Sequence, residues 1–237
     1  MSSGKTRQRN ARGEGSRLRL EIIEATIRLV DSDVDRLTLR AIAREAGIAG
    51  PSIYDHFQDI ESIRNGVIRS CYEDLIARIH EAQDNVVDPV ERLEATCFAY
   101  VNYGADLPHR YALLFQAERD ESEKLAVGDA GAAALQTLVD SIATCTETGR
   151  STSADPYEDA LAVWSAIHGL TTLRSSRPHF AGLHRDRLMR SVIHRLARIT
   201  DPPALSTEDQ DGDRPPRRQK QAVPRKRPQA KRRAARS

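Results

Sequence analysis

The sequence contains little that would suit a secreted, membrane-spanning or metal-binding protein. Aromatic residues make up 5% of its 237 residues, and no apolar run approaches the roughly 18–20 residues that cross a bilayer. Residues 1–15 lack the apolar segment of a signal peptide. The three cysteines, Cys71, Cys97 and Cys145, are odd in number and widely spaced, so they form neither a disulfide framework nor a metal pattern. We therefore expect a cytoplasmic protein with buried, reduced cysteines, no cofactor and no membrane partner.

Catalytic motifs are missing as well. The sequence has no Gly-rich phosphate loop, no Gly-x-Ser-x-Gly elbow, no His-Glu-x-x-His and no paired-cysteine motif. The acidic residues are expected on solvated helix faces or at helix caps, where they form no catalytic pair. The histidines that lie apart from any obvious nucleophile or ligand cluster are His80, His109, His168, His179, His184 and His194. The prediction is that the protein is not an enzyme.

The net charge of +2 conceals an uneven distribution along the chain. Residues 1–13 carry four Lys or Arg and residues 214–237 carry eleven, and neither stretch contains an acidic residue. The other 21 basic residues face all 34 acidic ones, which gives residues 14–213 a charge of −13. An acidic body with two basic ends indicates that the ends contact a polyanion. The plainer alternative for the C-terminal run is a solubilising tail.

Nearly every segment between residues 16 and 200 has helical periodicity, which predicts an all-α fold of about nine helices. Asp88 and Asp155 are each followed by proline and then, three positions after the aspartate, by glutamate, which is the pattern of a capping box. From residue 201 on, the chain is rich in Pro, Arg and Lys and is predicted to be disordered. One long apolar stripe is made of Ile60, Ile63, Val67, Cys71, Leu75 and Ile79.

The segment GIAGPSIYDHF, residues 47–57, has the composition of a tight turn followed by a short helix. Thr38 can cap a preceding helix that stops at Gly47, where a positive φ is easiest for glycine. Pro51 suits the first turn of the second helix, which is expected to run to about Phe57, because it forfeits no needed hydrogen bond there. The small side chains around Pro51 let this helix approach a surface closely, as a recognition helix does in the major groove. Residues 38–57 are therefore predicted to form a helix-turn-helix.

Here the chain resembles the TetR family of transcriptional regulators. The resemblance rests on LTLRAIAREAGIAGPSIYDHFQDIESI, residues 37–63, and above all on the Ala-Gly turn, the Ser-Ile-Tyr-x-His-Phe run and the Asp-x-Glu that opens the next helix. WSAIHGL, residues 164–170, also resembles a Trp…His-Gly signature in the C-terminal domain of one subgroup. Family members usually have a lysine where this chain has Ile60. The phosphate clamp that the resemblance implies is therefore incomplete, and Arg64 or the basic N-terminal arm could replace it.

The resemblance also implies an order of domains and a function. We expect a basic disordered arm (1–15), a helix-turn-helix DNA-binding domain (16–62), a helical effector-binding and dimerisation domain (63–200) and a disordered basic tail (201–237). The implied function is that of a ligand-responsive repressor that binds a near-palindromic operator in double-stranded DNA as a homodimer. A sequence-tolerant architectural protein of the nucleoid, which would use the basic tail, is the alternative.

The expected DNA contacts follow from the same resemblance. Arg40 and Arg44 either contact the DNA backbone or belong to ordinary solvated helix surface. The residues expected to approach bases are Ala49, Gly50, Pro51 and Ser52, and those expected to hold phosphates are Thr38, Tyr54 and His56. Ser52 is the one base-facing residue of this set that can form a hydrogen bond.

Two further sites are implied in the C-terminal domain. The dimer is expected to form as a four-helix bundle through helices at about 156–173 and 184–199, with Trp164, His168, Gly169, Leu188, Val192 and Leu196 at the interface. An unidentified small apolar effector is expected among Tyr72, Phe98, Tyr103, Tyr111, Phe115 and Trp164. The plainer alternatives are that these aromatics are ordinary core and that His168 is a packed histidine satisfied by a backbone carbonyl.

Overall fold

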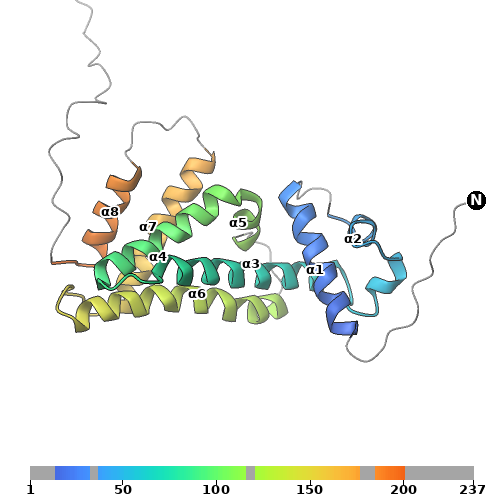
Figure 1. Ribbon diagram of the computed structural model, residues 1–237, viewed down its shortest axis with the longest axis horizontal. Helices are drawn as coiled ribbons and strands as arrows, with labels where there is room; N and C mark the ends of the chain where they lie inside the picture. The colour runs from blue at the N-terminus through green and yellow to red at the C-terminus, as the bar shows by residue number, and fades with distance from the viewer. Residues whose placement is uncertain (1–13, 33–36, 116–120, 177–184, 201–237) are drawn as a thin grey trace, which may run out of the picture. The chain divides into compact units, whose positions relative to one another are not determined.

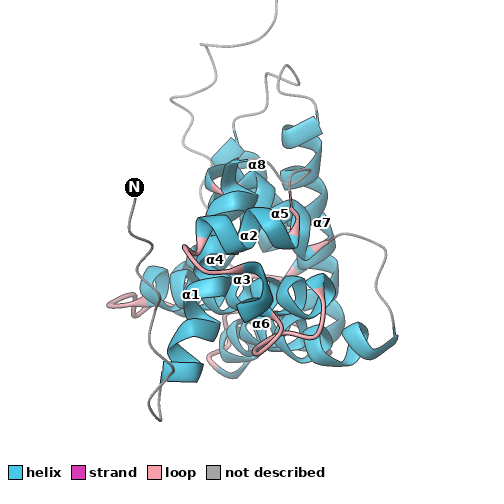
Figure 2. Ribbon diagram, turned by 90° about the vertical axis from the view of Figure 1, so that its right-hand side faces the viewer, coloured by secondary structure: helices cyan, strands magenta, loops and turns pink. Residues whose placement is uncertain are grey.

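The computed structural model describes residues 14–32, 37–115, 121–176 and 185–200, and these residues form helices joined by short loops (Figures 1 and 2). The elements in chain order are α1 (Glu14–Ser32), α2 (Leu39–Glu45), the 3₁₀ helix η2 (Gly50–Ile53), α3 (Ile60–Gln83), α4 (Pro89–Asp106), α5 (Pro108–Leu114), α6 (Glu121–Glu147), α7 (Pro156–Ser176) and α8 (Arg185–Leu196). The described residues thus contain eight α-helices and one 3₁₀ helix, which confirms the predicted all-α fold.

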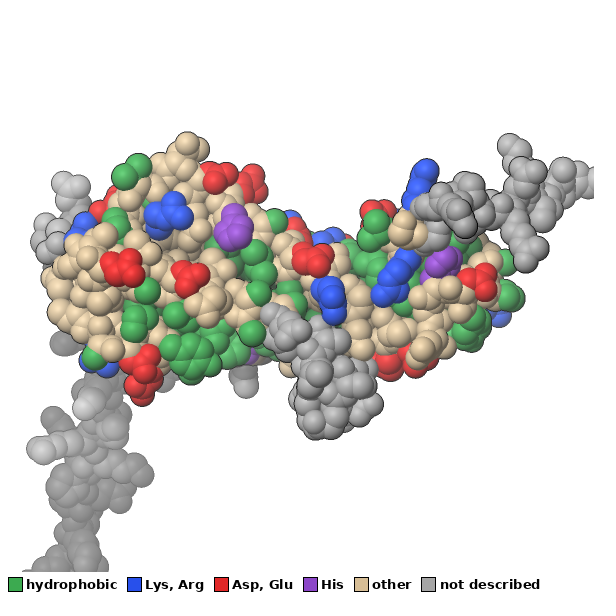
Figure 3. Space-filling model, turned by 90° about the horizontal axis from the view of Figure 1, so that it is seen from below, with side chains coloured by type: hydrophobic (Ala, Val, Ile, Leu, Met, Phe, Trp, Pro, Cys, Tyr) green, Lys and Arg blue, Asp and Glu red, His purple; other side chains and the backbone are tan. Residues whose placement is uncertain are grey.

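Some predicted segments lie outside the described residues. These are the basic tail from residue 201 on and nearly all of the N-terminal arm, because α1 begins at Glu14. Both stretches that carry the excess of positive charge are among them. On the face drawn in Figure 3, acidic and basic side chains are interspersed among apolar and uncharged ones. Within the described residues, no helix has both the length and the apolar character needed to cross a membrane.

Side-chain caps explain where several helices begin. Thr38, Asp59, Asp88 and Asp155 each accept a hydrogen bond from backbone N–H groups two or three residues further on. At Asp59 the capping box is complete, because Ser62 Oγ accepts a hydrogen bond in return from the backbone N–H of Asp59. At Asp88 and Asp155 the aspartate half of the predicted capping box is confirmed.

The long helix α3 is the centre of the molecule. It packs against α1, α4, α5 and α6, while α7 packs on α4 and α6, and α8 packs on α7 (Figure 1). The apolar stripe predicted on α3 faces this core: its members from Ile63 to Ile79 are at most 2% exposed, and Ile60 is half-buried. At the N-terminal end of α3, the first helices close around the buried side chains of Ile22, Ile42, Ile53 and Phe57.

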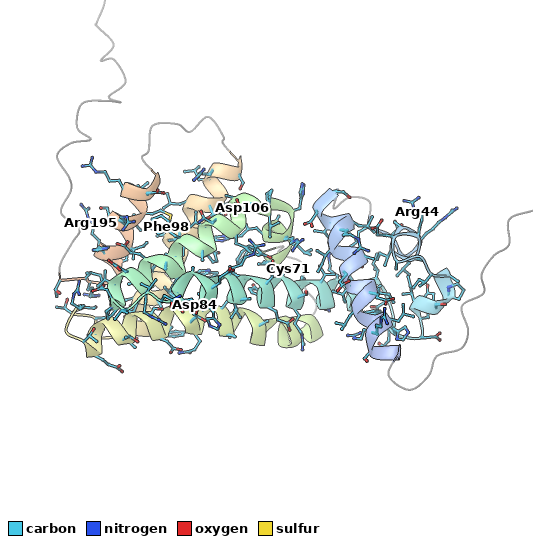
Figure 4. The ribbon with its side chains drawn as sticks, viewed as in Figure 1. Arg44, Cys71, Asp84, Phe98, Asp106 and Arg195 are labelled. Carbon is cyan, nitrogen blue, oxygen red and sulfur yellow. The ribbon has the colours of Figure 1, made fainter. Side chains whose placement is uncertain are left out.

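The cysteines are free thiols in the interior, as predicted from their number and spacing. Cys71 lies on α3 in the middle of the helix layer (Figure 4), Cys97 on α4 and Cys145 on α6. Burial raises the pKa of each thiol, to about 11 for Cys71 and Cys145. At neutral pH all three therefore remain protonated and behave as small apolar groups.

Candidate nucleic-acid interface and ligand cavity

The turn after α2 is a complete Schellman motif. The backbone N–H of Ile48 donates to the carbonyl of Ala43 at 2.9 Å, and that of Gly47 donates to Arg44 at 3.2 Å. Gly47 has a φ of +66°, and a Cβ added to it would meet no atom within 4 Å. Glycine is therefore required here by backbone conformation and not by space. The predicted turn is confirmed.

The segment that follows the turn, residues 49–56, is called the tip segment below. Its helix is shorter and tighter than predicted: residues Gly50–Ile53 form one 3₁₀ turn, and residues 54–56 continue as turns and do not extend a helix to Phe57. The amide of Tyr54 bonds to the carbonyl of Pro51, three residues back. Gly50 favours helix weakly, which agrees with the shortness of the helix.

The tip segment presents the side chains that were expected at DNA. Tyr54 is 61% exposed, and Ala49, Gly50 and Pro51 are also exposed. Ser52 and His56 are half-buried. Thr38, Arg40 and Arg44 are exposed at α2, and Figure 4 shows Arg44 on that helix.

One contact that sequence reasoning missed holds the end of the tip segment. Arg19 of α1 donates from Nη1 to the backbone carbonyl of His56 at 3.3 Å, and its guanidinium lies 4.2 Å from the centre of the Phe57 ring. A second pair, Arg28 with Glu45 at 2.9 Å, joins α1 to α2. Both contacts link residues 17 or more positions apart, so no local sequence pattern predicts them.

Ile60 and Arg64 lie at the start of α3, where the family resemblance places a phosphate clamp. Ile60 is half-buried and packs against the core, which agrees with its inability to bind a phosphate. Arg64 lies one turn further on and pairs with Glu61 at 3.6 Å. Compensation by Arg64 therefore stays a prediction.

The C-terminal helices enclose a cavity of about 100 Å³. Its wall comes from α3, α4, α6 and α7 and from Phe115 at the end of α5. The lining residues are Tyr72, Leu75, Ile79, Thr96, Tyr100, Phe115, Gly131, Ala134, Leu135, Leu138, Trp164 and Ile167.

Of the six aromatics expected to line such a cavity, Tyr72, Phe115 and Trp164 do so. Phe98 points toward α8, where Arg190 stacks over its ring at 5.3 Å (Figure 4). Tyr103 is fully buried and donates its hydroxyl proton to the carbonyl of Cys71 at 3.1 Å.

The sixth aromatic, Tyr111, belongs to a hydrogen-bonded group that we call the polar cluster: Tyr100, Tyr111, Trp164 and His168. The indole N–H of Trp164 donates to Tyr100 Oη at 3.2 Å, and Tyr100 Oη lies 3.0 Å from Tyr111 Oη. His168 Nδ1 lies 2.7 Å from Tyr111 Oη and 3.2 Å from Tyr100 Oη. Burial lowers the pKa of His168 and raises that of Tyr100, so all four side chains are neutral near pH 7.

His168 therefore bonds to tyrosine hydroxyls of its own chain through Nδ1, and not to a backbone carbonyl. The other residues expected at the dimer interface lie on α7 and α8. Leu188, Val192 and Leu196 are half-buried, and Gly169 is exposed with no atom within 4 Å of an added Cβ.

The short helix α5 connects the cavity region to α1. Arg110 donates from Nε and Nη2 to both carboxylate oxygens of Asp31 in α1, at 2.8 and 2.6 Å, and from Nη1 to Asp74 in α3 at 3.4 Å. The hydrogen bonds to Asp31 raise the pKa of Arg110. The next residue in the chain, Tyr111, belongs to the polar cluster.

A buried charged group joins α4 to α8. Glu94 is 7% exposed, accepts a hydrogen bond from Arg190, and has Oε1 2.6 Å from Nε2 of the buried His194. The expectation that acidic residues lie on solvated faces or at caps was wrong for Glu94 and for Asp159, which is 6% exposed and paired with Arg198. In the described part of the chain, no group of three or more His, Cys, Asp or Glu side chains could hold a metal ion.

Comparison with known proteins agrees with this arrangement. Residues 22–67 match the family model described as bacterial regulatory proteins, tetR family, and residues 93–196 match the one described as tetracyclin repressor-like, C-terminal domain. An uncharacterised HTH-type transcriptional regulator of Mycobacterium tuberculosis, Rv0681, is 27% identical over 187 residues, which cover 76% of this chain and 79% of that protein.

Two more similarities concern part of the chain or the fold. The HTH-type transcriptional repressor KstR2 of the same organism is 29% identical over 115 residues, 48% of this chain and 56% of the repressor. A Rhodococcus protein of unknown function has a solved structure that matches with a TM-score of 0.68 at 22% identity, covering 82% of this chain and 98% of that one. None of these matches names the Trp…His-Gly subgroup, which stays a prediction. The two family models together match more than half of the chain. One covers the helix-turn-helix, and the other covers most of the residues that line the cavity. The chain therefore belongs to the TetR family of transcriptional regulators.

Proposed function

We propose that the protein is a ligand-responsive repressor that binds a near-palindromic operator as a homodimer. The observation that carries this proposal is the tip segment, which exposes small side chains and Tyr54 and is held at one end by the Schellman turn and at the other by Arg19. Such a rigid, small-residue surface suits close approach to the major groove. The relative KstR2 is named as a transcriptional repressor, which supports repression over activation in this proposal.

In this proposal the DNA contacts are divided by chemistry. Ala49, Gly50 and Pro51 approach base edges and thymine methyl groups, and Ser52 forms the hydrogen bond to a base. Thr38, Tyr54 and His56 hold phosphates. Thr38 Oγ1 already accepts the amide of Ala41, which leaves its hydroxyl proton for a phosphate oxygen.

The dimer is proposed to form through α7 and α8. Gly169 supports this, because glycine in a helix interior costs about 1 kcal/mol relative to alanine and no contact within the protomer requires it. Leu173, one turn further along α7, is 38% exposed and adds apolar area to the same helix. Two tip segments would then read half-sites about 34–36 Å apart or a multiple of that distance.

The ligand response is proposed to pass from the cavity to the tip segment through α5. Arg110 and Tyr111 are consecutive residues of this seven-residue helix, and they contact α1 and the polar cluster respectively. A ligand that binds one position of α5 more tightly than another would shift α1 and lower the affinity for DNA.

A competition experiment tests the function. Purified protein is bound to labelled DNA from upstream of its own gene at fixed salt concentration and challenged with random duplex of equal length. We expect selective binding by a dimer. We also expect Tyr54→Ala to weaken binding to every duplex about a hundredfold, since each of the two protomers loses one hydrogen bond to a charged phosphate, worth about tenfold. His80→Ala, at an exposed position near the other end of α3, is the control and should bind as the parent does.

Three other outcomes would count against the proposal. Equal affinity for all duplexes would favour the sequence-tolerant architectural protein. Sedimentation as a monomer at the working concentration would exclude the paired tip segments. Unchanged binding by Tyr54→Ala would remove the assigned phosphate contact.

A further inference from the structure

We propose that the ligand of the cavity is an apolar molecule carrying one hydroxyl or carbonyl oxygen, and that this oxygen forms a hydrogen bond with the hydroxyl of Tyr100. The inference rests on the proposed function, because it names the chemical class of the effector. It is carried by the composition of the cavity wall and by the hydrogen-bonding capacity of the polar cluster.

Most of the wall can offer a ligand only apolar contact. Leu75, Ile79, Leu135, Leu138 and Ile167 supply aliphatic surface from three sides. The volume of about 100 Å³ is of the same order as cavities that take up one benzene-sized molecule, about 150 Å³. A charged ligand would lose its hydration here with no opposite charge on the wall to replace it.

The polar side chains of the wall differ in whether they can form a further hydrogen bond. Thr96 Oγ1 donates to the carbonyl of Arg92 at 3.0 Å, accepts from Gln83 Nε2 at 2.7 Å and lies 3.4 Å from Ser141 Oγ, so its three hydrogen-bonding positions are engaged by the protein. The Trp164 indole has a single N–H, and it is donated to Tyr100. Tyr100 Oη lies within hydrogen-bonding distance of Trp164 Nε1, Tyr111 Oη and His168 Nδ1. His168 Nδ1 has a single lone pair or proton and lies closer to Tyr111, so Tyr100 uses two of the three hydrogen bonds that a hydroxyl can form.

The order of protons in the polar cluster decides what Tyr100 offers. With the proton of neutral His168 on Nε2, Tyr100 donates to Tyr111 and Tyr111 donates to His168 Nδ1, which leaves Tyr100 one lone pair for a ligand hydroxyl. With the proton on Nδ1 the order reverses, and the Tyr100 proton is left for a carbonyl. The cluster can therefore satisfy either kind of oxygen through Tyr100.

The same contact explains how a ligand would be felt outside the cavity. A new bond at Tyr100 selects one of the two proton orders, and so determines whether Tyr111 donates to His168 or to Tyr100. Tyr111 is joined through the backbone of α5 to Arg110 and its ion pair with Asp31. A purely apolar molecule would fill the cavity and leave this order of hydrogen bonds unchanged.

Two probes of equal size test the inference on the intact protein. Cyclopentanol and methylcyclopentane each have six non-hydrogen atoms and differ by one hydroxyl. Binding of each is followed through the emission of Trp164, the single tryptophan of the chain, which lines the cavity. Ala134→Leu, which fills part of the cavity, should weaken both probes and so locate the binding.

The decisive variant is Tyr100→Phe, with Tyr103→Phe as its match on the same helix, since the Tyr103 hydroxyl is buried but does not line the cavity. We expect Tyr100→Phe to weaken cyclopentanol about fivefold to tenfold, the worth of one hydrogen bond, and to change methylcyclopentane by less than twofold. Tyr103→Phe should leave the ratio of the two affinities unchanged.

Three results would overturn the inference. The first is that the parent protein does not bind cyclopentanol. The second is that Tyr100→Phe lowers the affinity for both probes equally. The third is that Tyr72→Phe, and not Tyr100→Phe, lowers the affinity for cyclopentanol alone. Operator binding without ligand is measured on the same preparations. If it is intact while the probes fail, the ligand assignment is wrong and the DNA-binding proposal stands; if it is absent, the proposed function fails by itself.

Discussion

The tip segment and the polar cluster are held in place by opposite means. Around the tip segment, backbone groups three to five residues apart bond to one another, and side chains such as Tyr54 are exposed. In the polar cluster, side chains from three helices bond across 11 to 68 residues of sequence. The comparison indicates that the tip segment is fixed largely by its own turn, with Arg19 of α1 at its far end, whereas the cavity wall depends on how the helices pack.

The largest expected effect tests the dependence of the C-terminal domain on buried polar contacts. Glu94→Ala would leave Arg190 and the buried His194 without their carboxylate and should lower the free energy of unfolding by about 3 kcal/mol. Glu73→Ala, at an exposed position of α3, should change it by less than about 0.5 kcal/mol. Urea unfolding measures both. A loss at Glu94 no larger than that at Glu73 would mean that this charged group contributes nothing.

A smaller effect is expected at the turn before the tip segment. Gly47→Ala places a side chain at φ +66° and should cost about 1–2 kcal/mol. Gly50→Ala is the matched control, because its added Cβ also meets open space while its backbone is not in the left-handed region. That variant should keep its stability and change the preference among operator sequences. Equal destabilisation by the two changes would contradict the role given to Gly47.

The connection between α5 and α1 can be measured by a double-mutant cycle. Arg110→Gln and Asp31→Asn should show a coupling energy of about 1 kcal/mol in urea unfolding, because the pair is bidentate and partly buried. Arg78→Gln is the control. Arg78 forms an ion pair with Asp74, as Arg110 does, but the ion pair to Asp31 belongs to Arg110. Its cycle with Asp31→Asn should give a coupling near zero.

The smallest effect concerns protonation of the polar cluster. Because burial lowers the pKa of His168 in the folded protein, the unfolded chain takes up its proton at a higher pH. The stability due to His168 is therefore present above its unfolded pKa and is lost as the pH falls, so unfolding should become easier between about pH 7.5 and pH 5.5. His168→Gln should show a shallower dependence on pH over that interval. A steeper one would contradict the burial of this group.

The local features could be predicted from the sequence, and the long-range ones could not. Thr38, Gly47 and Asp59 act within five residues of themselves, so their caps and turn are visible in the order of residues alone. The pairing of Arg110 with Asp31 spans 79 residues and follows only from the packed fold.

Glu94 lies between these cases. It lies one turn from the buried Val90 and Cys97, on the apolar face of α4. A carboxylate among apolar residues at helical spacing predicts a buried partner of opposite charge, so this contact could have been expected from the sequence. The weak helix propensity of Gly50 also indicated a short η2. The three lining aromatics could not be separated from the other three, because a helical stripe does not distinguish a cavity wall from filled core.

The interior cysteines make the opening of the helix bundle measurable. A thiol reagent can reach Cys71, Cys97 or Cys145 only after neighbouring helices separate, so the rate of modification at each site records how often its helix is released. Cys71 reports on α3 beside Tyr103, whereas Cys145 reports on α6 where its thiol donates to the carbonyl of Pro89. Rates compared with and without a bound molecule would show which helices the molecule locks together and which continue to open.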